Sequence, residues 1–147
     1  INRTDTRLNN SDLQFTVFNP DFYDKKSGET PRFLYGRRYS HTLNHLLNTL
    51  ERRPGSTLLI MAYRNQSEGI DGSIEISRGE IQTANAYRTK VIVAQETGDV
   101  PPPSITFYNT SLSSLNTHIQ NIQEEFANDK SYNGIAIHYI NALLELK

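Results

Sequence analysis

Apolar and polar positions follow two different periods along the chain, and each change of period marks a predicted element. Short apolar or alternating runs predict strands over residues 13–18, 57–62, 90–94 and 134–138. Apolar residues spaced three and four apart predict helices over residues 37–53, 70–87, 112–129 and 140–146. A further short strand is predicted over residues 105–108. Strand and helix therefore alternate four times, which favours a parallel sheet with helical crossovers.

Four strand–helix units are half of an eight-unit α/β barrel. The predicted fold is therefore a parallel (βα)4 half-barrel, formed as a single α/β domain by residues 13–147. Residues 1–12 are polar and lack periodicity, so we interpret them as a flexible arm. A half-barrel exposes two sheet edges and an apolar face, so we expect a homo-oligomer or association with a missing barrel half. An antiparallel sheet built from the same strands is the alternative topology.

Composition and charge narrow the classes of function. The 147 residues carry a net charge of −1, so no nucleic acid is expected as a partner. No apolar run approaches the roughly 20 residues of a membrane span, and no membrane partner is expected either. Cysteine is absent, which excludes disulfides, thiol nucleophiles and cysteine-based zinc sites. Neither a glycine-rich phosphate loop nor a serine nucleophile elbow is present, and no cofactor is predicted.

Several smaller motifs each have a functional interpretation and an ordinary one. The chain starts at Ile1 without Met or signal peptide, which we interpret as a mature product, a tag-cleaved form or a fragment. His41 and His45 have a spacing that can share a metal ion, but without a Glu after His41 we interpret both as helix-surface residues and predict no metal site. N-x-S/T sequons also occur, either as glycosylation sites or by chance, at Asn2, Asn9, Asn65 and Asn109.

Polar residues at the ends of the predicted strands are the candidates for function. Ligands of parallel α/β folds bind at the carboxyl ends of the strands. The residues at these positions are Asn19, Asp21 and Tyr23; Tyr63, Arg64 and Asn65; Gln95 and Glu96; and His138 and Tyr139. Together they would supply carboxylates, a cation, an imidazole and phenols to one rim, although loop polarity alone also explains each residue.

Two of these residues have a specific chemical role and a specific alternative. Glu96 would be a general acid/base or a nucleophile, or it would form a salt bridge with Arg64. His138 would orient a ligand oxygen, or it would be a hydrogen-bonded core histidine.

The strand-end motifs carry a resemblance to a known family. The motifs are LIMAYRN (59–65), KVIVAQET (90–97), ITFY (105–108) and GIAIHY (134–139). In combination they resemble the last four barrel strands of a poorly characterised, often secreted TIM-barrel family that is similar to glycoside hydrolases. The resemblance spans residues 13–146 and implies an extracytoplasmic, carbohydrate-active protein. It implies Glu96 as the nucleophile at the seventh barrel strand, Asp21 as the second carboxylate, and sugar contacts from Tyr63, Arg64, Asn65, His138 and Tyr139.

The chain departs from that pattern in one respect. The acid/base of such enzymes commonly follows the fourth strand, which this chain lacks, and retaining chemistry needs two carboxyl groups about 5 Å apart. Three hypotheses follow: a hydrolase half, a non-catalytic glycan-binding module with the same rim, and a structural protein that oligomerises through its sheet edges.

Overall fold

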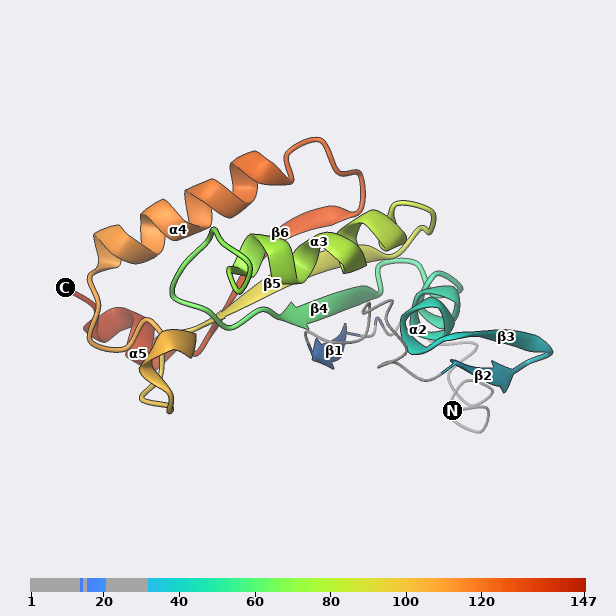
Figure 1. Ribbon diagram of the computed structural model, residues 1–147, viewed down its shortest axis with the longest axis horizontal. Helices are drawn as coiled ribbons and strands as arrows, with labels where there is room; N and C mark the ends of the chain where they lie inside the picture. Colours follow the sequence, from blue (N-terminus) through green and yellow to red (C-terminus); the bar gives the residue numbers. More distant parts are fainter. Residues whose placement is uncertain (1–13, 15, 21–31) are drawn as a thin grey trace.

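The computed structural model describes residues 14, 16–20 and 32–147 (Figure 1). Its larger sheet has four parallel strands in chain order: β1 (Thr16–Pro20), β4 (Thr57–Met61), β5 (Lys90–Glu96) and β6 (Tyr132–His138). An antiparallel hairpin consists of β2 (Arg32–Tyr35) and β3 (Arg38–His41). The helices are α2 (Thr42–Leu50), α3 (Ser73–Ala84), α4 (Leu112–Glu125) and α5 (Ile140–Glu145), with a 3-10 turn η1 at Pro103–Ile105. The predicted parallel α/β class is confirmed.

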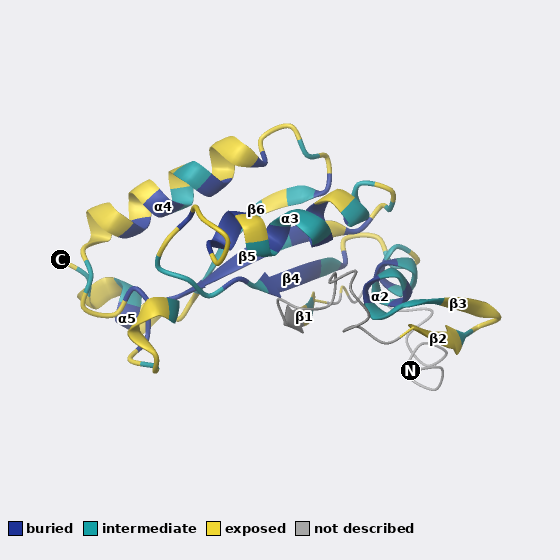
Figure 2. Cartoon of the chain, viewed as in Figure 1, coloured by how far each residue is buried: buried dark blue, intermediate teal, exposed yellow. Residues whose placement is uncertain are grey.

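The two central strands are the most buried part of the sheet (Figure 2). Their continuous apolar sequences suit strands that are covered on both faces. Leu58 and Ile60 of β4 point to the helices together with Val91 and Val93 of β5. On this face they pack against side chains from three helices, namely Leu43, Leu47, Leu50, Ile74, Ile81, Ala84 and Ile122.

The opposite face of the sheet carries its own row of apolar side chains. Phe18, Leu59 and Ile92 are in register on β1, β4 and β5. Because side chains alternate along a strand, these three point away from the helical core that holds Leu58 and Val91. The sheet therefore has one face under helices and a second apolar face.

The helix predicted over residues 112–129 is confirmed and ends at Glu125. Ser111 caps it, because the Ser111 Oγ atom accepts a hydrogen bond of 3.1 Å from the backbone N–H of Ser114. Leu115, His118 and Ile122 form its buried face. The apolar spacing of the sequence thus fixes which side of α4 meets the sheet.

The first predicted helix, residues 37–53, is wrong over its first turn. Residues Arg38–His41 are extended and pair with Arg32–Tyr35, and the helix begins only at Thr42. Gly36 and Arg37 form the turn with φ of 55° and 70°. A two-residue turn of this kind matches the twist of a hairpin, which explains the strand pairing.

Other element boundaries also differ from the prediction. The strand predicted over residues 105–108 is absent from the described part of the chain, where η1 and a loop take its place. The second helix starts at Ser73 rather than residue 70, after an extended Gly72. Strand β5 continues through Glu96, so this residue ends the strand rather than following it. The predicted arm over residues 1–12 lies outside the described residues.

A bulge interrupts the pairing of β5 and β6. Val91 is opposite Tyr132, whereas Val93 is opposite Ile135, so β6 contains one extra residue in this interval. The extra residue is accommodated at Gly134, whose φ of 105° is accessible mainly to glycine. Beyond the bulge, Glu96 is directly opposite His138.

Candidate functional site

Three neighbouring strands bring candidate residues together at one edge of the sheet. Glu96 ends β5, His138 ends β6, and Tyr63 follows β4 by two residues. Because β5 lies between β4 and β6, Glu96 has Tyr63 on one side and His138 on the other. We call the group of Tyr63, Glu96, His138 and Tyr139 the rim site.

The Glu96 carboxylate is held by two hydrogen bonds. Its Oε2 atom lies 2.5 Å from the Nδ1 atom of His138, and its Oε1 atom accepts the backbone N–H of Gly98 at 2.6 Å. Glu96 is only 3% exposed, while the His138 side chain is 58% exposed. A buried carboxylate thus orients an imidazole that is open to solvent, as in the histidine–carboxylate pairs of many enzymes.

Two phenol rings flank this pair. The Tyr63 ring is stacked on the His138 ring, with centroids 6.2 Å apart and planes 13° from parallel. The Tyr139 ring meets His138 edge-on at 5.4 Å. Tyr139 is exposed and Tyr63 is half-buried. The rim site therefore combines a hydrogen-bonded carboxylate and imidazole with aromatic surface.

Burial raises the pKa of the Tyr63 phenol above its ordinary value, and the negative charge of Glu96 raises it further. The phenol is therefore neutral at physiological pH. It can donate a hydrogen bond to a ligand oxygen.

Two residues that sequence reasoning missed position the rim site. The Thr97 Oγ1 atom donates to the carbonyl oxygens of His138 and Tyr139, at 3.2 and 3.1 Å. A Cβ atom at Gly98 would lie 2.7 Å from the Tyr139 ring and 3.0 Å from the Glu96 carboxylate, so only glycine fits without displacement. The Glu-Thr-Gly sequence directly after an apolar strand was the available signal.

Arg64 and Asn65 are engaged elsewhere. Arg64 pairs with Asp71 at 2.8 Å and donates to the Tyr63 carbonyl oxygen at 2.7 Å. The Asn65 amide donates to the Pro103 carbonyl oxygen at 2.9 Å. The alternative of an Arg64–Glu96 salt bridge is therefore wrong, and both residues instead order the loop after β4.

Gln95 points to the other face of the sheet. It is fully buried, and its amide donates to the Ala62 carbonyl oxygen at 3.2 Å and to the Ser73 hydroxyl at 3.3 Å. Gln95 follows the alternation of β5 and joins the helical core, whereas Glu96 faces the rim.

Two interpretations of histidines need correction. His138 is exposed, so the alternative of a core histidine is wrong. His45 is buried rather than on the helix surface, with its Nε2 atom 3.0 Å from the Phe33 carbonyl oxygen. His41 accepts a hydrogen bond from Arg32, so the two rings have separate partners. Within the described ranges, no three His, Asp or Glu side chains are grouped as metal ligands.

Some candidates lie outside the described residues: Asp21, Tyr23, Asn2 and Asn9, together with the side chain of Asn19. Of the other two sequons, Asn109 is in an exposed turn with φ of 60°, and Asn65 is half-buried. An open pocket of about 510 Å³ lies beside α3 and α4, and its lining includes Glu68, Ile70, Glu75, Arg78 and Glu125. None of the described helices has the length and hydropathy needed to cross a bilayer.

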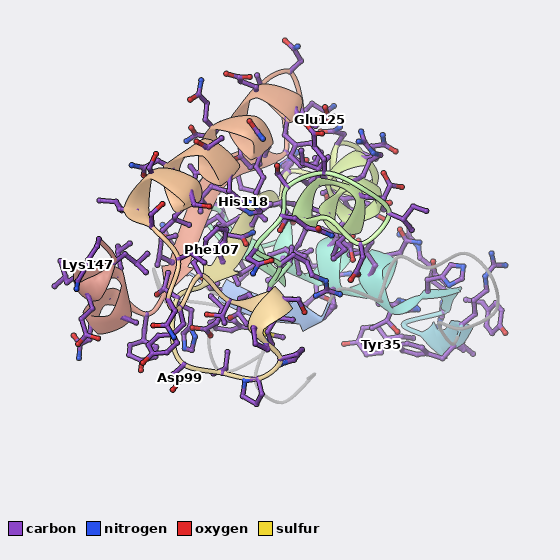
Figure 3. The ribbon with its side chains drawn as sticks, turned by 60° about the vertical axis from the view of Figure 1, so that its left-hand side comes forward. Tyr35, Asp99, Phe107, His118, Glu125 and Lys147 are labelled. Carbon is purple, nitrogen blue, oxygen red and sulfur yellow. The ribbon has the colours of Figure 1, made fainter. Side chains whose placement is uncertain are left out.

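The remaining one of the chain's four histidines, His118, is buried behind the loop that follows η1. Its ring meets the Phe107 ring edge-on, with centroids 4.8 Å apart. Figure 3 labels both residues. Neither ring nitrogen has a hydrogen-bond partner among the described residues, and burial lowers the pKa of His118 to about 4. This ring is a neutral packing element.

The comparisons with known proteins give no assignment: no family model, no curated protein and no solved structure matches the chain. The chemistry of the rim site therefore has to be argued from its geometry.

Proposed function

We propose that the rim site binds a carbohydrate and that Glu96 and His138 provide acid–base chemistry on it. The observation that carries this proposal is the 2.5 Å contact between buried Glu96 and exposed His138, flanked by the rings of Tyr63 and Tyr139. Aromatic faces stack on sugar rings, and neighbouring carboxylate, imidazole and phenol groups exchange hydrogen bonds with sugar hydroxyls. Such mixed apolar and polar surfaces suit a glycan ligand.

The position of the rim site supports a half-barrel as the finer fold. The strands follow one another in chain order without crossing, as successive strands of a barrel do. Glu96 and His138 share the sheet face of Ile92, opposite the helices, which is the face that lines the interior of a closed barrel. In this proposal the chain is the C-terminal half of a secreted TIM-barrel protein that is similar to glycoside hydrolases.

The different exposure of Glu96 and His138 assigns a different role to each side chain. Glu96 is almost inaccessible and already accepts two hydrogen bonds, so it acts by fixing the His138 ring. The exposed imidazole then meets the substrate and transfers the proton. In the alternative mechanism, Glu96 itself attacks the sugar as a retaining nucleophile. This mechanism requires a second carboxyl group about 5 Å from that of Glu96. Asp21 is the proposed second carboxylate.

A glycan assay tests the proposal. Wild-type protein, Glu96→Gln and the matched control Glu145→Gln, an exposed residue of α5, would be tested on aryl glycosides and a panel of soluble oligosaccharides. We expect Glu96→Gln to lower hydrolysis about 100-fold and the control to retain it. Equal activity of Glu96→Gln and wild type would refute the catalytic role. Glycan binding without hydrolysis by the wild type would identify a binding module, and no glycan binding would overturn the proposal.

Assembly through the sheet is a second candidate function. On the face opposite the helices, Phe18 is 59% exposed, and it is in register with Leu59, which is buried, and Ile92, which is half-buried. Within the described strands, β1 and β6 each have a partner on one side only. Exposed apolar rows and unpaired strand edges favour association with a second copy or with a barrel half.

A further inference from the structure

The hairpin of β2 and β3 projects from the molecule with apolar side chains in solvent. Leu34 and Tyr39 are opposite each other in the register and are 69% and 67% exposed. Cross-strand partners point to the same face of a hairpin, so these two side chains form one exposed apolar pair. Exposed residues of this size together on a projecting element are characteristic of an interaction surface.

The same hairpin is cationic. Residues 32–50 contain Arg32, Arg37 and Arg38 and no Asp or Glu. All three arginines are exposed, and within the described part of the chain no carboxylate pairs with Arg37 or Arg38. The whole chain has a net charge near zero, but the surface around the apolar pair is positively charged.

The inner side of the hairpin is anchored to α2. Phe33 and Tyr35 pack against the buried ring of His45, with centroids 4.5 and 5.7 Å from it. Since side chains alternate, this contact directs Leu34 and Tyr39 away from the helix. The exposed face is thus held in place by packing on its other side.

We propose that this hairpin face, consisting of Arg32, Leu34 and Tyr39 with Arg37 at its turn, binds the surface of an anionic lipid membrane. Leu34 and Tyr39 enter the boundary between headgroups and acyl chains, where tyrosine is favoured and leucine gains apolar contact. The arginines meet lipid phosphates and the negative surface potential. A single-stranded nucleic acid fits less well, because base-stacking surfaces need several aromatic faces and this one pairs a single tyrosine with an aliphatic side chain.

The hairpin face is separate from the rim site. The rim lies at the carboxyl ends of β5 and β6 beside α5, and the hairpin extends from the opposite end of the molecule (Figure 1). Membrane contact there would leave the rim site accessible. The two proposals can therefore fail independently.

Vesicle co-sedimentation of the full chain tests the membrane proposal. Vesicles of phosphatidylcholine with 30% phosphatidylserine would be compared with pure phosphatidylcholine vesicles, at about 0.05 and 0.5 M salt. We expect binding to the anionic vesicles only, weakened at high salt. Arg37→Glu should lower the bound fraction at least about fivefold, and Leu34→Ser should lower it as well.

Matched controls separate the hairpin from general charge and hydrophobicity. Arg88→Glu makes the same charge change at an exposed arginine outside the hairpin, and Leu144→Ser makes the same apolar change on α5. Both should bind as the wild type does. No binding to anionic vesicles, equal losses in the control variants, or binding of a single-stranded oligonucleotide in place of vesicles would each overturn the proposal.

Discussion

The Nδ1 atom of His138 and the Oε2 atom of Glu96 are 2.5 Å apart, although 42 positions separate the two residues in the chain. An ionised carboxylate can only accept, so the proton of this hydrogen bond belongs to the Nδ1 atom of His138, and a neutral ring in this position is the Nδ1–H tautomer. The Nε2 atom is then an acceptor, which is the state that a general base requires.

The tautomer of His138 provides the first prediction. In the wild type at neutral pH, we expect the Nδ1–H tautomer, which is normally the minor form of imidazole. Long-range ¹H–¹⁵N NMR spectra distinguish the two nitrogens directly. In Glu96→Leu, which has no acceptor at this position, the Nε2–H form should become predominant. An Nε2–H tautomer in the wild type would contradict the proposed orientation of the ring.

Burial of His118 predicts a loss of stability in acid. Its pKa is about 4 in the folded protein and near 6.5 when exposed, so between these values the unfolded chain binds a proton that the folded chain does not. Stability is unaffected by this group above pH 6.5 and falls as the pH drops, by up to about 3 kcal/mol near pH 4.

Urea unfolding at pH 7.5, 5.5 and 4.5 measures that effect. In His118→Leu the ring is replaced by an apolar side chain in the same pocket beside Phe107. The difference in unfolding free energy between wild type and variant should grow in favour of the variant as the pH falls. A constant difference across the three pH values would show that His118 is not the cause.

Thr97 is expected to position the rim site. Thr97→Val keeps the shape of the side chain but removes the hydroxyl that holds the His138 and Tyr139 carbonyl oxygens. We expect a loss of roughly 1 kcal/mol in unfolding free energy. The His138 resonances should also shift. Thr117→Val, which removes a similar hydroxyl bond on the exposed side of α4, should leave those resonances unchanged.

The second candidate function predicts an assembly that depends on Phe18. Size-exclusion chromatography with light scattering should show an oligomer for the wild type and a smaller species for Phe18→Ser. Ile70→Ser removes an even more exposed apolar side chain from a loop and should leave the mass unchanged. A wild-type monomer at all concentrations would argue against assembly through this face.

The sequence predicted the parallel α/β class because its signals are local. The apolar runs of β4 and β5 and the three-and-four spacing of α4 each depend on a few neighbouring residues. The hairpin was missed because Tyr39 shares a helical period with Leu43. The stronger local signal was Gly36 between two runs rich in β-forming residues, which favours a tight turn.

The rim site was predictable only in part. Strand ends identified Glu96, His138 and Tyr63, but their polarity alone could not separate them from Arg64 or Gln95. Arg64 has a nearer carboxylate in Asp71, seven residues away, and Gln95 points to the helices because of strand alternation. Which polar residues meet depends on contacts between distant segments, and the sequence pattern of a single strand does not contain them.

The bulge at Gly134 makes the Glu96–His138 pair depend on the pairing register of β5 and β6, and not on residue identity alone. Without the bulge, and with every residue of β6 kept, Ile137 would be opposite Glu96 and His138 would lie one position farther along the strand. A regular strand of the same length would therefore place an aliphatic side chain opposite Glu96, whereas removal of one residue between Tyr132 and Ile135 would abolish the bulge and keep His138 opposite Glu96. The constraint therefore falls on Gly134, because a residue that resists its positive φ would disturb the bulge and with it the register that brings the two side chains together.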